Sequence, residues 1–154
     1  MEFIEYQTPS AWKSKDFDDS SWIDILSNDQ REELLMLAKS LPDKEDEWLT
    51  ITKSDLALNY LKPVFVKTNE ELERGRGFVL LRDLGITGDD VDLAYRVNWI
   101  LALGLGDVIA QNANGEVIGA VQAVVQADDN GANTRGYVSN AELRFHCDGG
   151  DVAS

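Results

Sequence analysis

Hydrophobic residues recur at helical spacing in two segments of the chain. In residues 27–41 they fall three or four positions apart, and Pro42 ends the pattern (Leu34, Leu35, Leu37, Ala38 and Leu41). Ser27 and Gln30 have the spacing of a capping box, in which each residue bonds the backbone of the other. We therefore predict a helix over residues 27–41.

The second such segment covers residues 87–103. Thr87 is the predicted N-cap, Asp89 and Asp90 suit the positive end of a helix, and Gly104 is the predicted stop. The residues expected along its packed side are Val91, Ala94, Tyr95, Asn98 and Leu101 or Leu103. Two weaker helical segments are predicted at residues 53–61, before Pro63, and at residues 68–74.

Strand patterns dominate the second half of the sequence. A glycine-containing break at residues 75–77 precedes a predicted buried strand at residues 78–81. Residues 108–113 and 116–121 flank Asn114-Gly115, a pair typical of a tight hairpin turn, and residues 137–145 are extended in character. Residues 1–21 carry spaced aromatic side chains and are expected to form an arm that packs on the domain.

Helices first and strands later predict an α+β fold. The 154 residues are enough for one domain with a hydrophobic core. We expect a single partial domain over residues 1–154, with an arm and helices in residues 1–60 and the start of a larger β structure in residues 61–154. The strand pattern near the end of the sequence leads us to expect that further sequence completes it.

The charge balance disfavours some classes of partner. The chain has 28 acidic and 14 basic residues, which gives a net charge of −14. Such a surface repels phosphate backbones, so we expect neither nucleic acid nor an anionic membrane as a partner. The single cysteine, the absence of a basic amino-terminal leader and the short apolar runs make a cytoplasmic location the expectation.

His146, the only histidine, lies two residues before Asp148. In a strand these two side chains point to the same face, with α-carbons about 6.6 Å apart. An imidazole and a carboxylate placed in this way can share one metal ion, as two members of the two-histidine, one-carboxylate triad that binds iron(II). Taken alone, the spacing favours a packed, hydrogen-bonded histidine beside Phe145 over a metal ligand.

Three segments resemble the TauD/TfdA-like dioxygenases, in particular those grouped with clavaminate synthase. The most specific is residues 136–152, which contains the His-Cys-Asp triplet and resembles the family's stretch around the first two iron ligands. Residues 74–84 resemble an early strand of the family, and residues 111–119 resemble its middle segment. The three occur in the family's order, and the resemblance covers about residues 60–154.

The resemblance implies a double-stranded β-helix, or jelly-roll, core with helical additions at its amino-terminal side. It makes His146 and Asp148 the first two iron(II) ligands, with 2-oxoglutarate as cosubstrate and O2 as oxidant. In this family, oxidative decarboxylation of 2-oxoglutarate drives the oxidation, usually a hydroxylation, of a small organic substrate. Neither the substrate nor the oligomeric state follows from the sequence.

The family also requires a second histidine and, beyond it, an arginine that binds the 2-oxoglutarate carboxylate. This sequence has one histidine, and no arginine follows Asp148. We therefore expect a fragment of such an enzyme, inactive by itself. Two alternatives remain open: a non-catalytic acidic interaction module, and a small protein that holds a divalent ion with His146, Asp148 and Asp151.

Other residues near the expected site have weaker patterns. Asn140 shares the parity of His146 and Asp148 along a strand, so it is a candidate for substrate contact, although a strand-end amide fits as well. Gln111 precedes the predicted turn and is a candidate for the mouth of the pocket or for a surface loop. Cys147 is out of phase with both ligands and is expected to point away from the metal.

Overall fold

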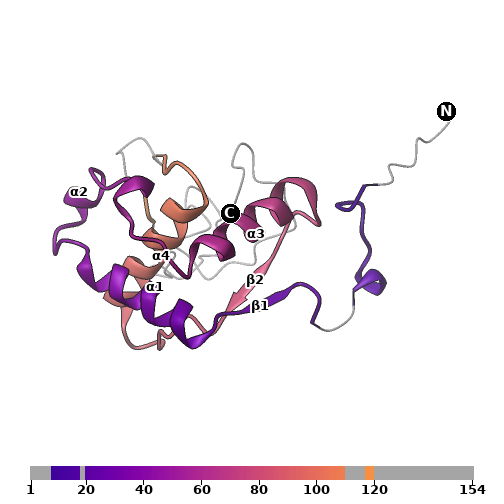
Figure 1. The fold of residues 1–154 in the computed structure, drawn as a ribbon, viewed down its shortest axis with the longest axis horizontal. Coiled ribbons are helices and arrows are strands. Elements are labelled where there is room, and N and C mark those ends of the chain that lie inside the picture. The colour runs from indigo at the N-terminus through magenta and orange to yellow at the C-terminus, as the bar shows by residue number, and fades with distance from the viewer. Residues whose placement is uncertain (1–7, 18–19, 110–116, 120–154) are drawn as a thin grey trace, which may run out of the picture. The chain divides into compact units, whose positions relative to one another are not determined.

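The computed structural model describes residues 8–17, 20–109 and 117–119. The chain divides into two compact units, Met1–Val108 and Ile109–Ser154. In the second unit the described residues, Ile109 and 117–119, lie in no helix or strand. In the first unit the elements follow the order η1 (Ser14–Asp16), β1 (Ile23–Ile25), α1 (Asn28–Ser40), α2 (Glu45–Trp48), η2 (Lys53–Asp55), α3 (Lys62–Arg74), β2 (Leu80–Arg82) and α4 (Val91–Leu105) (Figure 1).

The predicted first helix is confirmed in α1. Ser27 is its N-cap: its hydroxyl accepts a hydrogen bond from the Gln30 backbone at 3.3 Å, and the Gln30 side chain accepts one from the Ser27 backbone at 2.9 Å. The buried side contains the predicted Leu34, Leu37 and Ala38, and Leu41 is buried at the C-cap. Local sequence signals therefore define both ends of this helix and the side that packs.

Helix α3 corrects two predictions. Of residues 53–61, only Lys53–Asp55 form a turn of 3-10 helix, and the weak segment at 68–74 is the second half of a helix that starts at Lys62. The helix was predicted before Pro63, but Pro63 lies in the first turn of α3, where a helix needs no backbone N–H from it. Leu61, Phe65 and Thr68 form the buried side of α3.

Helix α4 exists as predicted, but its ends and packed side differ. Asp90 is the N-cap in place of Thr87, because its carboxylate accepts a hydrogen bond from the Leu93 backbone at 3.0 Å. The helix continues through Gly104, and Gly106 is the C-cap. Val91 and Asn98, expected on the packed side, are exposed. The predicted Leu103 is buried, and the other buried residues are Arg96, Val97, Trp99, Ile100 and Gly104.

The described part contains a two-stranded parallel sheet. Ile23, Asp24 and Ile25 of β1 pair with Leu80, Leu81 and Arg82 of β2. Strand β1 was not predicted, and β2 begins two residues later than the predicted strand. The prediction of a buried strand was wrong for β2, because Leu80 and Arg82 are exposed and Leu81 is only half-buried.

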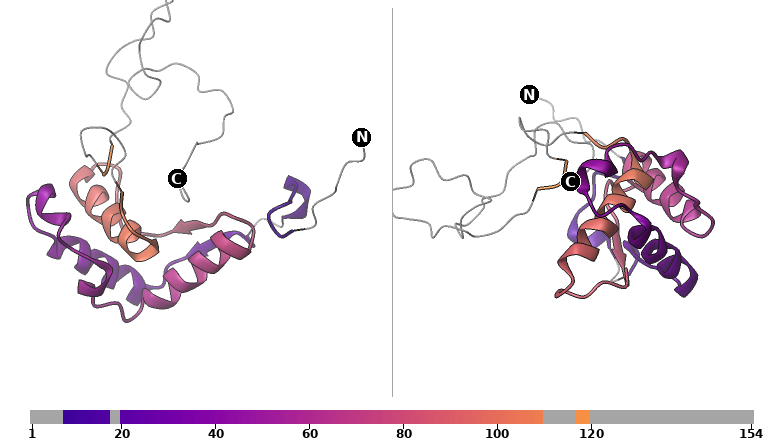
Figure 2. Two further views of the ribbon diagram at one scale, coloured as in Figure 1. Left: turned by 90° about the horizontal axis from the view of Figure 1, so that it is seen from above. Right: turned by 90° about the vertical axis from the view of Figure 1, so that its left-hand side faces the viewer.

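The hydrophobic core of the first unit lies between the three long helices. Both α1 and α3 pack against α4 (Figure 2). The Trp48 and Trp99 rings lie 5.9 Å apart between their centroids, and both side chains are buried. The largest fully buried side chains come from all three helices and from Leu61 at the start of α3 (Trp99, Phe65, Leu34, Leu61, Ile100, Val97 and Thr68).

Several predicted elements fall outside the described residues. They are most of the hairpin around Asn114-Gly115 and the whole extended segment at residues 137–145. The predicted start of the jelly-roll therefore stays a prediction, while the described elements form a mixed α and β structure. Within the described ranges, no helix combines the length and apolar character needed to cross a bilayer.

Candidate functional site

The residues predicted to carry chemistry all lie outside the described ranges. This holds for His146 and Asp148 as iron ligands, for Asn140 and Gln111 as substrate contacts, and for Asp151. Among the described residues, no three His, Cys, Asp or Glu side chains are grouped so that they could hold a metal ion. What the structure shows is therefore the framework of the first unit, and three groups of polar residues within it.

The first group centres on a buried carboxylate on α1. Glu33 is only 6% exposed, and it accepts three backbone hydrogen bonds, from Asn59 and Tyr60 at 2.8 Å and from Leu61 at 2.7 Å. These N–H groups immediately precede α3, where a negative charge is favoured by the helix dipole. Glu33 therefore fixes the start of α3 against α1.

The second group centres on a buried guanidinium on α4. Arg96, 8% exposed, donates to the Leu41 carbonyl at 2.7 Å and to the Asp92 carboxylate at 2.7 Å. Its guanidinium also lies 5.6 Å from the centre of the Trp48 ring. A positive charge at the carbonyl end of α1 is favoured by the helix dipole. Arg96 thus joins α4 to the end of α1, as Glu33 joins α1 to the start of α3.

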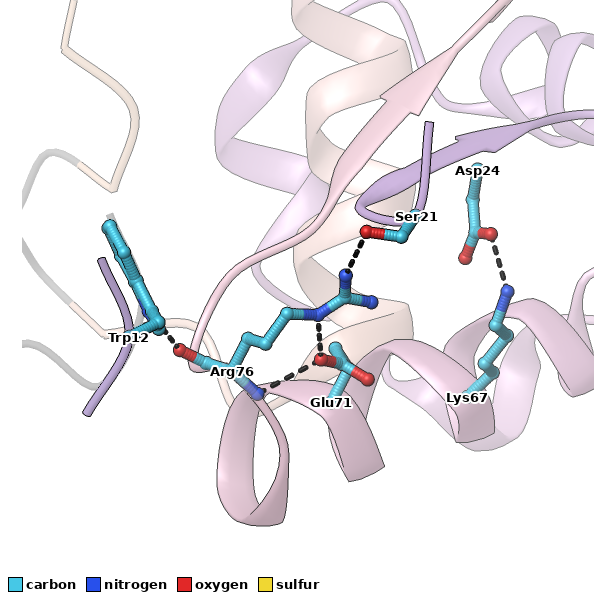
Figure 3. A network of polar contacts seen from close by, with 6 residues as sticks. All are labelled: Trp12, Ser21, Asp24, Lys67, Glu71 and Arg76. Atoms are coloured by element: carbon cyan, nitrogen blue, oxygen red, sulfur yellow. Dashed lines mark hydrogen bonds and ion pairs between the residues drawn. The ribbon is translucent and has the colours of Figure 1, made fainter. Parts of the chain in front are cut away.

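The third group surrounds Arg76, in the loop between α3 and β2 (Figure 3). Its backbone N–H and its Nε both donate to Glu71 Oε1, at 2.9 and 2.6 Å. Its Nη1 donates to the Ser21 hydroxyl at 3.1 Å, and its carbonyl accepts from the Trp12 indole at 3.0 Å. One arginine therefore connects α3, the segment before β1 and the amino-terminal arm.

A shallow hollow lies beside this group, between β1 and the first half of α3. Its volume is about 210 Å³, and its lining includes Gln30, Pro63 and the Asp24–Lys67 ion pair shown in Figure 3. Ligand sites usually enclose roughly 300–1,000 Å³. The hollow is smaller, and its two charges neutralise each other, so we assign it no ligand.

Sequence analysis did not single out Glu33, Arg96 or Arg76. A signal for the first two was present, because Glu33 lies beside Leu34 and Leu37, and Arg96 beside Val97 and Ile100, on the packed sides of their helices. A charged residue on such a side is expected to find specific partners, since burial without them is costly. Arg76 had no comparable signal, because its partners are distant in the sequence.

No protein-family model matches the chain. The chain is similar to FR-33289 synthase from Streptomyces rubellomurinus, with 26% identity over 146 residues. The match covers 94% of this chain and 43% of that synthase. The chain therefore spans less than half the length of this relative.

Proposed function

We propose that this chain is part of a non-haem iron(II), 2-oxoglutarate-dependent oxygenase of the TauD/TfdA type, in which His146 and Asp148 are two of the iron ligands. The observation that carries the proposal is the His-Cys-Asp triplet within residues 136–152. Imidazole nitrogen and carboxylate oxygen are the donor types of the iron(II) triad. The proposed substrate is a small organic molecule.

The similarity to a synthase supports an enzymatic role for the protein. Because the match covers 94% of the chain, it includes most of the three segments that resemble the oxygenase family. The similarity extends across the amino-terminal helices as well. These helices therefore belong to the proposed enzyme as a framework, and the buried charges of Glu33 and Arg96 hold that framework together.

The proposed iron centre needs residues beyond those in this sequence. The triad requires a second histidine, and the chain has one. The relative is more than twice as long as the matched segment, which leaves room in a protein of that size for the second histidine and the cosubstrate-binding arginine. We propose that both come from polypeptide outside these 154 residues.

Each part of the proposed site has a distinct task. The bound iron would activate O2 with electrons from 2-oxoglutarate and direct the oxidation to a carbon of the substrate. On a strand, His146 and Asp148 would position the metal from one face, while Cys147 would point to the opposite face. Asn140, on the ligand face, and Gln111 are the proposed contacts to the organic substrate.

Iron(II) binding by the purified chain tests the ligand pair directly. We expect His146→Ala and Asp148→Ala each to weaken binding by more than about tenfold, since loss even of a residue that only orients a metal ligand costs 10- to 100-fold. Anaerobic equilibrium dialysis against iron(II) measures this. Cys147→Ser is the matched control, and it is expected to bind as the unmodified chain does.

The Asp151→Ala variant distinguishes the oxygenase proposal from the alternative that the chain is a small metal-binding protein. The oxygenase proposal expects no change in iron affinity, because Asp151 is not one of the proposed ligands. A loss as large as that of His146→Ala would favour the alternative in which Asp151 completes the site. Equal affinity in all four variants would show that the His-Cys-Asp triplet does not bind the metal.

Turnover of 2-oxoglutarate tests the need for the missing residues. We expect the 154-residue chain with iron(II), ascorbate and O2 to form no succinate above a metal-free control. The reason is that a cosubstrate without its arginine loses a bidentate, charge-assisted contact. Metal-dependent succinate formation by this chain alone would contradict the proposal that the second histidine and the arginine lie elsewhere.

A further inference from the structure

The amino-terminal arm, residues 8–17, docks on the loop that joins α3 to β2. Trp12 and Phe17 of the arm and Phe78 of the loop form a cluster of three rings, with centroids 5.1 to 5.4 Å apart and edge-to-face geometry. The Trp12 indole also donates to the Arg76 carbonyl at 3.0 Å. The arm is therefore held by one small patch of aromatic and polar contacts.

Arg76 is the residue on which these contacts converge. Its carbonyl accepts from Trp12, and its guanidinium lies 5.9 Å from the centre of the Phe17 ring. Both its backbone N–H and its side chain are bonded to Glu71 Oε1. These two bonds hold the guanidinium and the amide of Arg76, and the peptide that carries its carbonyl is held by a further bond, from the Gly77 N–H to the Glu71 backbone carbonyl at 3.0 Å. Glu71 thus orients the groups that the arm contacts, although no contact between Glu71 and the arm is among those described.

We propose that residues 8–17 form a strap that opens and closes as a unit, and that Glu71, acting through Arg76, is the latch that keeps it closed. Glu71 is a positioning residue in this arrangement. Each residue of this device lies in the first unit, and none of them is a proposed iron ligand or substrate contact, so its test does not rely on the iron proposal.

The strap differs from the helical core in the way it is held. Trp12 is 44% exposed even when docked, and the arm has no buried residue among those described. Segments with few buried apolar contacts open at a lower free energy than the core does. The three helices share an interior of fully buried side chains, so opening of the strap leaves that core intact.

The latch is sensitive to protonation. The pKa of the Glu71 carboxyl lies below its ordinary value of 4.5, mainly because the Arg76 side chain donates a hydrogen bond to it, and next because the Arg76 backbone does. Lys67, one turn earlier on α3, adds a smaller coulombic effect in the same direction. A lowered pKa means that the ionised carboxylate stabilises the Glu71–Arg76 contact above pH 4.5, and that this stabilisation is lost as the pH falls through the lowered value. The strap contacts Arg76, so it is expected to loosen over the same pH range.

Trypsin provides a test, because Lys13 and Lys15 lie between the two aromatic residues of the strap. Both lysines are exposed in the docked strap. Because proteolysis of an ordered segment follows the population of its open form, we expect cleavage at both sites to become faster as the strap opens. Glu71→Gln and Arg76→Ala are expected to raise the cleavage rate at Lys13 and Lys15 by roughly tenfold, the scale of one hydrogen bond to a charged group. Glu73→Gln, at an exposed position on the same helix, is the matched control and is expected to cleave at the unmodified rate.

Cleavage at Lys39, in α1, distinguishes opening of the strap from unfolding. The proposal expects this site to stay as protected in Glu71→Gln as in Glu73→Gln. It is overturned if cleavage at Lys39 rises in parallel with that at Lys13 and Lys15, or if both latch variants cleave as the control does.

Indole N–H resonances give a second test in the unmodified chain. Trp12 donates to a carbonyl in the strap contact, and Trp48 donates to the Pro42 carbonyl at 2.8 Å within the core. On acidification below pH 4.5 the Trp12 resonance is expected to move toward the position of a solvated indole, while that of Trp48 stays. The same shift of Trp12 is expected for Glu71→Gln at neutral pH. Joint movement of both resonances, or of neither, would overturn the latch.

Discussion

Replacing Glu33 with alanine is expected to lower the free energy of unfolding by about 2–4 kcal/mol. The substitution removes the acceptor of three backbone hydrogen bonds at the start of α3. The Leu61 N–H is in a fully buried residue and has no access to water as a replacement, whereas Asn59 and Tyr60 are exposed enough to be rehydrated. Urea denaturation followed by tryptophan fluorescence measures the loss.

Two further variants show whether the loss of stability comes from the carboxylate of Glu33 or from any substitution at this part of α1. Glu33→Gln keeps the length of the side chain, but it turns an amide donor toward backbone donors, so we expect it to destabilise by more than about 1 kcal/mol. Glu32→Ala, at the exposed neighbouring position, is expected to change stability by no more than about 0.5 kcal/mol. Equal stability of the Glu32 and Glu33 variants would show that the buried carboxylate does not hold α3.

The parts of the fold that the sequence predicted correctly are those set by local interactions. Helix α1 begins with a capping box between residues three apart and ends just before a proline, so its boundaries needed no tertiary information. The break after α3 is of the same kind, because the N–H of Gly75 bonds the carbonyls of Glu70 and Glu71 within the same turn.

The errors occur where partners distant in sequence decide the outcome. A helix was predicted to end before Pro63. Instead, the Glu33 carboxylate accepts a hydrogen bond from the backbone just before Pro63, and α3 starts there. Strand β1 is three residues long and exists through pairing with β2, more than fifty positions away. The packed side of α4 was misplaced because Arg96 belongs to it, and its burial depends on the Leu41 carbonyl and on Trp48.

The candidate functional residues also differ in whether their partners are close in the sequence or distant in it. The His-Cys-Asp triplet is a local motif, so it was open to sequence analysis, and its residues lie outside the described ranges. The Arg76 latch is a tertiary feature: its partners Trp12, Ser21 and Glu71 come from three separate segments. No spacing rule along the chain joins these residues, so only the structure shows that they meet.

Gly104→Ala is expected to destabilise the protein by about 2–3 kcal/mol, the scale of an overpacked core. Replacement of glycine by alanine inside a helix normally stabilises it, by about 1 kcal/mol. Here the added methyl carbon would lie 2.2 to 2.4 Å from three atoms of the Phe65 ring, where α3 and α4 pack. Because Phe65 is buried, its ring has little freedom to withdraw, so the clash outweighs the gain in helix propensity.

A double variant tests whether the Phe65 ring is the cause. Phe65→Leu alone leaves a cavity, but it removes the ring atoms that the new methyl group would meet. We therefore expect Gly104→Ala to cost at least about 1 kcal/mol less in the Phe65→Leu background than in the unmodified chain. Gly88→Ala, with no heavy atom within 4 Å of its added carbon, is the control and is expected to be within about 0.5 kcal/mol of neutral. If Gly104→Ala raises the melting temperature, α3 and α4 do not approach as closely as this glycine implies.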